Sequence, residues 1–200
     1  MELAEVRRKR RMVRHYDPTT PVPDAALERI LEAGLRVPSA GFTQGVSLLV
    51  LDGPDKERYW AVTTDPDSDA DRWLTGMQTA PVLIVVWTDP AAYLDRYAEP
   101  DKGWTDRDPS RWTAPYWHVD AGMAVLAMLY AAVDEGLGAC FFGAPPDRIG
   151  PLRSAYGVPE HHELVGVVSV GCPAGVAARS RRGRRPAGEL IHRGSWQRPE

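Results

Sequence analysis

The sequence predicts a protein of the α/β or α+β class, and two observations support this prediction. Segments with the apolar repeat of a helix alternate along the chain with short runs of strand-forming residues. The 200 residues are 44% hydrophobic and 26% charged, which is ordinary for a globular protein and argues against extensive disorder. This length favours one sizeable domain over two independent ones.

The first half of the chain predicts one helix and two strands. Residues 24–35 have helical periodicity, with Asp24 in a position to cap the helix and Pro38 to stop it. Residues 47–51 and 81–87 are typical of strands, and the continuous apolar run in 81–87 indicates burial on both faces. We expect both strands to be internal to the sheet.

The second half begins with the clearest helix. Residues 116–135 carry two apolar stripes, so this helix is expected to be buried on more than one side, in the core or in a dimer interface. Gly136 is placed to end it. Further on, the sequence predicts a strand over 139–142, a helix over 147–156 closed by Gly157, and a buried strand over 164–170.

A long aromatic-rich stretch at about 88–115 separates the second strand from the long helix. Connections of this length tend to be functional, and we interpret this one as an insertion that covers a pocket. Trp104 and Trp112 are the candidates for stacking on a planar substrate. The alternative is a surface excursion pinned by its aromatic residues, with only a packing role.

The ends of the chain and its cysteines indicate a cytoplasmic protein. No apolar run of secretory type follows the arginine-rich start, and no stretch approaches membrane-spanning length. Cys140 and Cys172 lie in or beside apolar runs, which favours buried free thiols over a disulfide.

The net charge of −3 conceals two arginine clusters. One lies within residues 7–14 and the other within residues 179–185, with acidic residues between them. Such clusters either repel one another or share an anion. Each cluster alone is also compatible with a solvated surface or with nonspecific nucleic-acid binding.

Several motifs in a fixed order connect these clusters to a known family. They are, in chain order, Arg10–Asp17, Val37–Gly45, Asp120–Ala124, Gly136–Gly143, Val170–Pro173 and Arg184–His192. Together they resemble the nitroreductase family over nearly the whole chain, apart from the insertion. The resemblance implies an α+β, three-layer α/β/α fold, with a mixed, mainly antiparallel sheet flanked by helices. It also implies an intertwined homodimer that binds FMN, with a C-terminal arm at about 178–200.

The resemblance also implies roles for individual residues. Arg10, Arg182 and Arg184 would hold the FMN phosphate, to which guanidinium groups are well matched. Arg14 would lie at the pyrimidine edge of the flavin, and the Phe142–Gly143 backbone would face N5. The opposite subunit would supply the segment that begins at Pro38. The full set of implied cofactor-binding residues is Arg10, Arg11, Met12, Arg14, Pro38, Ser39, Ala40, Phe42, Gln44, Phe142, Gly143, Arg182 and Arg184.

Three positions depart from the family's usual pattern. Met12 stands where many members have Ser, Phe42 replaces a common Asn, and Phe142 replaces a frequent Glu. These changes make the surroundings of the flavin ring more apolar. The sequence therefore supports flavin binding more strongly than nitroreduction.

Other constellations of residues do not support a different chemistry. His161 and His162 are adjacent, so their side chains would diverge in a strand or lie far apart around a helix, and no shared metal site is expected. We interpret them as part of a loop before the strand at 164–170. The Gly136-Leu-Gly138 turn follows a helix and does not match the Rossmann fingerprint. No framed nucleophilic serine accompanies His118 and Asp120, so hydrolase chemistry has little support.

The predicted activity is that of an FMN-dependent oxidoreductase. NAD(P)H would reduce the flavin, and a nitroaromatic, quinone or related small electron acceptor would reoxidise it in a ping-pong cycle. We expect a homodimer, with neither nucleic acid nor membrane as a partner. One alternative is a flavin- or deazaflavin-binding protein of the same fold with a specialised biosynthetic role. Another is a non-redox module that binds flavin or nucleic acid.

Overall fold

A computed structural model describes residues 1–65, 71–175 and 183–196. The described residues form one antiparallel sheet with the strand order β1-β2-β4-β3. Its strands are β1 (Val46–Asp52), β2 (Val82–Thr88), β3 (Gly138–Phe142) and β4 (Glu163–Gly171). Met12 adds an isolated parallel bridge to Ala139, so the pairing is mixed but mainly antiparallel.

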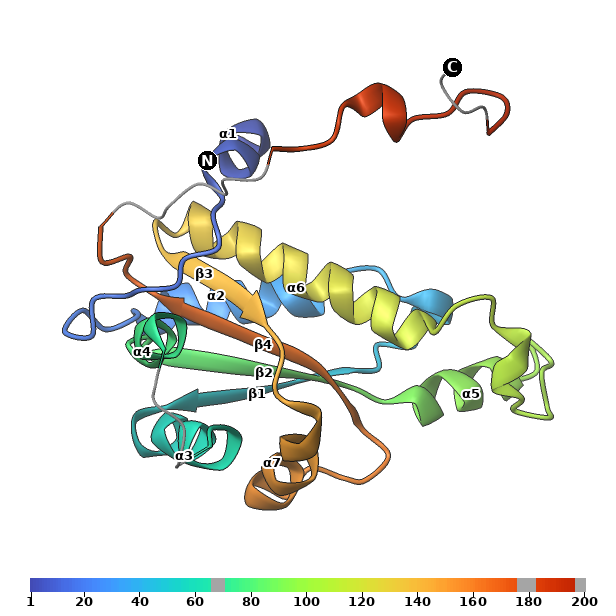
Figure 1. Cartoon of the computed structure of the whole chain (residues 1–200). Helices are drawn as coiled ribbons and strands as arrows, with labels where there is room; N and C mark the ends of the chain where they lie inside the picture. The colour runs from blue at the N-terminus through green and yellow to red at the C-terminus, as the bar shows by residue number, and fades with distance from the viewer. Residues whose placement is uncertain (66–70, 176–182, 197–200) are drawn as a thin grey trace.

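Helices cover both faces of this sheet (Figure 1). On one face lie α2 (Asp24–Leu35) and α6 (Tyr116–Asp134), which pack against each other. On the other lie α3 (Gly53–Thr63), α4 (Arg72–Gln78) and α7 (Ile149–Tyr156). The remaining helices are α1 (Leu3–Lys9) near the N-terminus and α5 (Pro90–Ala98) beyond β2. The predicted three-layer α+β fold is confirmed.

Alternation along β2 explains the two apolar layers. Leu83, Val85 and Trp87 enter the core beneath α3 and α7, whereas the intervening residues enter the core beneath α2 and α6. All seven residues of β2 are buried, as the continuous apolar run predicted. By contrast, β1 is an edge strand and only partly buried, so the expectation that it is internal is wrong.

The start of α2 also differs from expectation. Pro23 is the N-cap residue of α2 and Asp24 lies in its first turn, so Asp24 does not cap the helix. Within the insertion, residues 90–98 form α5, whose N-cap Asp89 accepts hydrogen bonds from the backbone N–H groups of Ala91 and Ala92. The expectation that no stretch approaches membrane-spanning length is wrong, because among the described helices α6 is long and apolar enough to span a membrane. Its contacts with α2 and the sheet are those of a core helix.

The two cysteines are free, and Cys140 is buried whereas Cys172 is partly exposed. Burial raises the pKa of the Cys140 thiol, and the nearby Arg14 charge opposes this rise only in part. In the native protein at pH 8, we therefore expect Cys140 to resist a thiol-specific disulfide reagent and Cys172 to react. A Cys172→Ser variant should react only after unfolding, and its rapid native reaction would contradict this prediction.

Candidate cofactor site

The segment after α1 brings the first arginine cluster to the edge of the sheet. The backbone N–H of Val13 donates to the carbonyl oxygen of Ala139 over 3.0 Å, and Tyr16 bridges to Pro173. The Tyr16 hydroxyl donates to the carbonyl oxygen of Val13 over 2.7 Å, and its burial raises its pKa. The chain is thus fixed beside β3 and the end of β4.

One pocket of about 800 Å³ brings residues from both ends of the chain together. Arg10 and Arg184 both line it, although they are far apart in sequence. The Nη1 atom of Arg10 is buried and has no hydrogen-bond partner among the described residues. The residues that line this pocket are Ala4, Arg7, Arg8, Arg10, Met12, Leu126, Leu129, Tyr130 and Arg184. A buried, unpaired guanidinium nitrogen in a basic pocket fits an anionic group such as a phosphate.

Arg11 points elsewhere. Its Nη1 donates to the carbonyl oxygens of Arg8 and Arg10, over 2.7 and 2.8 Å, at the end of α1. It also lines a separate pocket of about 330 Å³ beside Val13 and Gly138. The arrangement is that of a cation satisfying the last carbonyls of a helix. Arg182 lies outside the described residues.

Arg14 is exposed and lies near Cys140 of β3, where its charge offsets part of the rise in the thiol pKa that burial causes. Its carbonyl oxygen lies against Gly76 of α4, which is buried. A Cβ atom at position 76 would stand 2.3 Å from that oxygen. The N-terminal segment therefore passes α4 at a distance that a larger residue would prevent.

A third pocket, of about 570 Å³, is lined by aromatic side chains at the end of β3. The rings of Trp60 and Phe142 lie nearly parallel, with centroids 5.8 Å apart and an interplanar angle of 6°. Trp73 meets Phe142 edge to face at 5.6 Å. Gly143 also lines this pocket and is exposed, and no described atom would contact a Cβ there. A planar group could approach the Gly143 backbone closely.

The Pro38–Gln44 segment lies near the other end of α6, away from the arginine pocket. The Ser39 hydroxyl oxygen accepts a 3.0 Å hydrogen bond from the backbone N–H of Gln44. Gly41, Phe42 and Gln44 adopt positive φ angles of 62°, 56° and 56°, and Phe42 is 73% exposed. Such strain in non-glycine residues is typical of binding segments.

Asp120 fixes this segment, a role that the sequence analysis did not predict. Its carboxylate is 2% exposed, and the same oxygen, Oδ2, accepts 2.8 Å hydrogen bonds from the backbone N–H of Ala40 and the hydroxyl of Tyr93. Burial and the Asp120 hydrogen bond raise the pKa of Tyr93. The sequence feature that could have indicated this role is an acidic residue on the inner face of an otherwise apolar helix.

We expect Asp120→Ala to lower the free energy of unfolding by about 2–4 kcal/mol, because it leaves the buried Tyr93 hydroxyl and the partly buried Ala40 N–H without their acceptor. Urea denaturation followed by circular dichroism measures this. Asp120→Asn is the matched control, since the amide oxygen can still accept both hydrogen bonds, and it should cost much less. Equal stability of the two variants would contradict the role assigned to the carboxylate.

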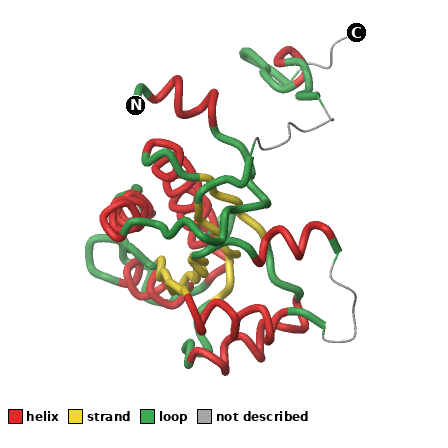
Figure 2. The backbone as a smooth tube through the Cα atoms, turned by 90° about the vertical axis from the view of Figure 1, so that its left-hand side faces the viewer, coloured by secondary structure: helices red, strands yellow, loops and turns green. Residues whose placement is uncertain are grey.

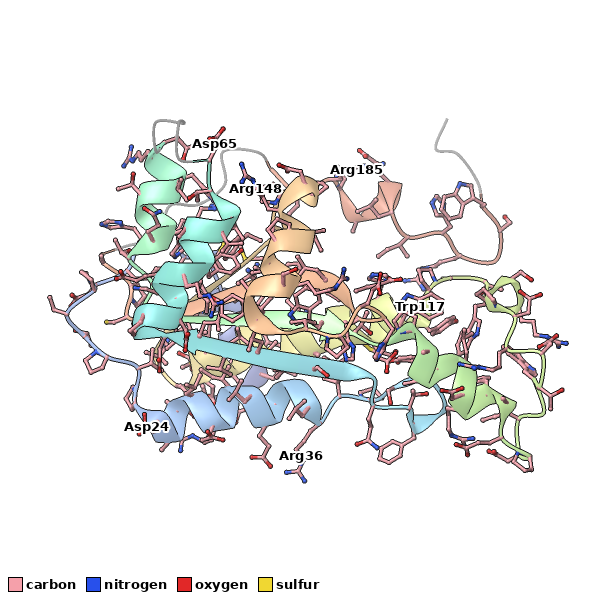
Figure 3. All side chains as sticks on the ribbon, turned by 90° about the horizontal axis from the view of Figure 1, so that it is seen from below. Asp24, Arg36, Asp65, Trp117, Arg148 and Arg185 are labelled. Carbon is pink, nitrogen blue, oxygen red and sulfur yellow. The ribbon has the colours of Figure 1, made fainter. Side chains whose placement is uncertain are left out.

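The predicted substrate-stacking residues belong to an aromatic cluster in the insertion. Trp104 and Trp112 lie edge to face, with ring centroids 5.5 Å apart, and Tyr97 contacts both. Figure 3 shows the side chains of the insertion gathered at one end of the molecule, near Trp117. Neither tryptophan lines the arginine pocket or the Phe142 pocket described above.

The two adjacent histidines lie close together. The ring centroids of His161 and His162 are 4.6 Å apart, so their side chains do not diverge as they would in a strand or helix. The physical reason is that they lie in a turn, where the backbone N–H of His162 donates to the carbonyl oxygen of Pro159, and not in a helix or strand. The predicted loop before β4 is confirmed.

Comparisons with known proteins agree with this architecture. A protein of Archaeoglobus fulgidus, named as a candidate NADH dehydrogenase/NAD(P)H nitroreductase, is 29% identical over 191 residues, which cover 94% of each chain. The NADH dehydrogenase of Thermus thermophilus is 27% identical over 183 residues, 83% of this chain and 84% of its own. A solved structure of a candidate nitroreductase in complex with FMN, from Desulfovibrio desulfuricans, superimposes with a TM-score of 0.74 at 27% identity, covering 98% of this chain and 99% of its own.

A family model gives the most direct assignment. Residues 8–172 match the model described as the nitroreductase family, a range that includes the whole sheet, α6 and the N-terminal arginines from Arg8 onward. Since this match covers most of the sequence, the chain belongs to the nitroreductase family.

Proposed function

We propose that this protein is an FMN-dependent oxidoreductase that uses NAD(P)H to reduce nitroaromatic, quinone or related electron-poor acceptors. The observation that carries the proposal is the meeting of Arg10 and Arg184 in one pocket, with a buried nitrogen of Arg10 left unpaired among the described residues. The FMN in the Desulfovibrio desulfuricans structure and the names of the relatives support the same cofactor and reductant.

Different residues of the candidate site would contact different parts of such a cofactor. Arg10 and Arg184, with Arg182, would bind the phosphate through charge-assisted hydrogen bonds. Arg14 would place a positive charge at the pyrimidine edge. The Gly143 backbone, beside the Phe142 ring, would face the reactive edge of the flavin. Met12 lines the arginine pocket as an apolar wall, and Arg11 would support the site by holding α1.

When bound, the flavin would accept hydride from NAD(P)H and pass it to the acceptor, in a ping-pong cycle. The protein's part is to bind and orient both partners and to exclude water. The parallel rings of Trp60 and Phe142 offer an apolar wall for planar molecules. Trp104 and Trp112, within the insertion, would stack on planar acceptors and help to exclude water.

The proposal requires a homodimer. An apolar stripe is exposed along the outer side of α6, at Tyr116, Val119, Met123 and Leu126. The Pro38–Gln44 segment lies toward one end of this helix and the arginine pocket toward the other. A second chain packed on the stripe would bring its Pro38, Ser39, Ala40, Phe42 and Gln44 to the arginine pocket of the first.

The organisation of the chain fits this assembly. We propose one FMN-binding domain over residues 1–200, with an insertion at about 88–115 and a C-terminal arm at about 178–200, in the cytoplasm. Figure 2 shows α1 and the described part of the arm projecting from the same side of the body. Apart from His192, every described residue of the arm is exposed, including Leu190 and Ile191, as expected for a segment that docks on another chain.

Absorption spectroscopy of the purified protein tests the proposal. We expect a yellow protein with one FMN per chain that bleaches anaerobically on addition of NADH or NADPH and recovers its colour with a quinone or a nitroaromatic. A protein that binds FMN but bleaches with neither nucleotide would overturn the proposed reductant. A colourless protein that cannot be reconstituted with FMN would overturn the cofactor.

A further inference from the structure

We propose that Asp89, His161 and His162 form a binding site for a divalent transition metal, with Zn²⁺ as the best match. The three side chains lie outside the pockets described above and have no part in the proposed flavin chemistry. The inference rests on the geometry of these residues and does not depend on the proposed function.

The register of the sheet brings the three residues together. Thr88, the last residue of β2, pairs with Glu163, the first residue of β4. The residue after β2 and the residues before β4 therefore meet at the same end of two neighbouring antiparallel strands. They are Asp89 and the His161-His162 pair.

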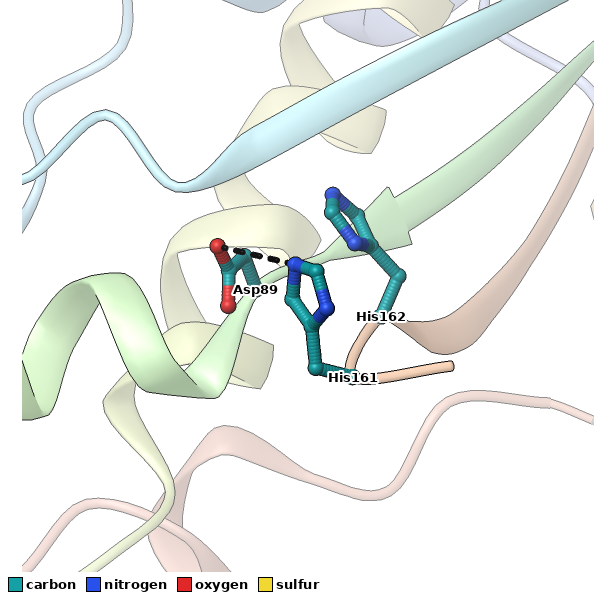
Figure 4. Close-up of side chains that lie close together, drawn as sticks. All are labelled: Asp89, His161 and His162. Carbon is teal, nitrogen blue, oxygen red and sulfur yellow. Dashed lines mark ion pairs between the residues drawn. The ribbon is translucent and has the colours of Figure 1, made fainter. Parts of the chain in front are cut away.

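The ligand atoms already lie near the distances that a metal requires. One atom from each of the three residues lies within 4.8 Å of the others. His161 Nε2 is 3.7 Å from Asp89 Oδ2, and Figure 4 shows the His161 ring facing this carboxylate with the His162 ring next to it. Zinc with ligands at about 2.1 Å in a tetrahedron separates them by about 3.4 Å. Small side-chain rotations, of the half-exposed His161 above all, would complete the site.

The backbone around the site holds these side chains in place. Asp89 Oδ1 accepts from the N–H groups of Ala91 and Ala92, over 2.9 and 3.3 Å, and so turns Oδ2 toward His161. The Asp89 N–H donates to the Gly45 carbonyl oxygen over 2.8 Å. His162 Nδ1 is buried and has no hydrogen-bond partner among the described residues. A preorganised carboxylate beside an unsatisfied imidazole is typical of a ligand site.

Neighbouring charges are balanced around the site. Arg153 Nη2 donates to the His162 carbonyl oxygen over 2.7 Å and adds a positive charge. Glu163 adds a negative charge and pairs with His118 at 3.3 Å. With two neutral imidazoles and one carboxylate, the ligand set carries one negative charge, which favours a divalent cation.

The ligand types narrow the choice of metal. Imidazole suits zinc, copper, nickel and iron, whereas calcium and magnesium prefer sites made of oxygen atoms. Two histidines and one carboxylate are a common zinc set that leaves a fourth position for water. A bound metal would tie the first turn of α5 to the turn before β4, and so fix the base of the insertion.

Isothermal titration calorimetry with Zn²⁺ tests the site. The sample is the full-length protein, produced without a histidine tag and freed of metals with a chelator. We expect one zinc ion per chain with a dissociation constant in the micromolar range or below, and a rise in melting temperature on binding. Mg²⁺ should give neither signal.

Variants locate the bound ion. His161→Ala and His162→Ala should each weaken zinc binding about tenfold or more. Asp89→Asn should also weaken it while keeping the N-cap of α5, since Asn caps helices as well as Asp. His192→Ala, on the C-terminal arm, is the matched control and should bind zinc normally. Absence of stoichiometric binding, or binding that survives both His161→Ala and Asp89→Asn, would overturn the proposal. Because His161 is half exposed, its variant should remain folded.

Discussion

Replacing Arg10 with alanine is expected to weaken FMN binding about 10- to 100-fold while leaving the fold intact. A hydrogen bond to a charged group contributes about 1.5–3 kcal/mol, which corresponds to this range of affinity. Arg10 is the described arginine of the pocket with a buried and unpaired guanidinium nitrogen, so its loss removes a donor already in position. Arg184→Ala should act in the same direction with a smaller effect, because Arg184 is exposed.

Equilibrium titration of apoprotein with FMN, followed by flavin fluorescence, measures both affinities. Arg36→Ala is the matched control, since Arg36 is exposed at the C-cap of α2 and pairs with Glu32 at 2.8 Å. The control should bind FMN like the parent protein. If Arg10→Ala retains full affinity on dilution while circular dichroism shows a native fold, the pocket does not hold the phosphate.

Replacing Met123 with glutamate is expected to convert the dimer into monomers and to abolish FMN retention at micromolar protein concentration. Met123 lies on the exposed apolar stripe of α6 but does not line either pocket of the candidate site. A carboxylate buried in an apolar interface without a partner costs several kcal/mol. Flavin should be lost with the partner, because the Pro38–Gln44 segment would no longer reach the arginine pocket.

Size-exclusion chromatography with light scattering gives the mass, and the absorbance ratio of flavin to protein gives the occupancy. Ala61→Glu provides the control, since Ala61 is exposed on α3, across the sheet from α6. It should leave both quantities unchanged. A dimeric Met123→Glu protein with full flavin occupancy would show that the stripe is not the interface.

The helices and strands that sequence patterns predicted correctly are those whose pattern comes from burial. The continuous apolar run of β2 could only be a strand covered on both faces, and the long repeat of α6 required a partner on more than one side. The edge position of β1 could not be predicted in this way. Its apolar run resembles that of an internal strand, and only the pairing order distinguishes the two.

Some residues of the candidate site could likewise be predicted from the sequence, and others could not. Arg10 and Arg184 could be singled out because two basic clusters at opposite ends imply a shared anion. That the Arg11 side chain lies in a different pocket from Arg10 could not be predicted, since it depends on how α1 ends. Asp120 and the Asp89–His161–His162 group depend on which elements meet in space. Strand register and helix packing decide this, and a single sequence does not reveal either.

The close passage of the N-terminal segment over α4 limits how this sequence can change. Glycine within a helix lowers the stability of the fold by about 0.5–1 kcal/mol relative to alanine, so helix propensity alone would favour replacing Gly76 with alanine. A methyl group there would meet the Arg14 carbonyl oxygen at 2.3 Å, and backbone cannot move aside as a side chain can. In a complete single-substitution library, we therefore expect position 76 to reject even alanine. The position of the Arg14 backbone, and with it the place proposed for Arg14 beside the flavin, therefore depends on a glycine in α4.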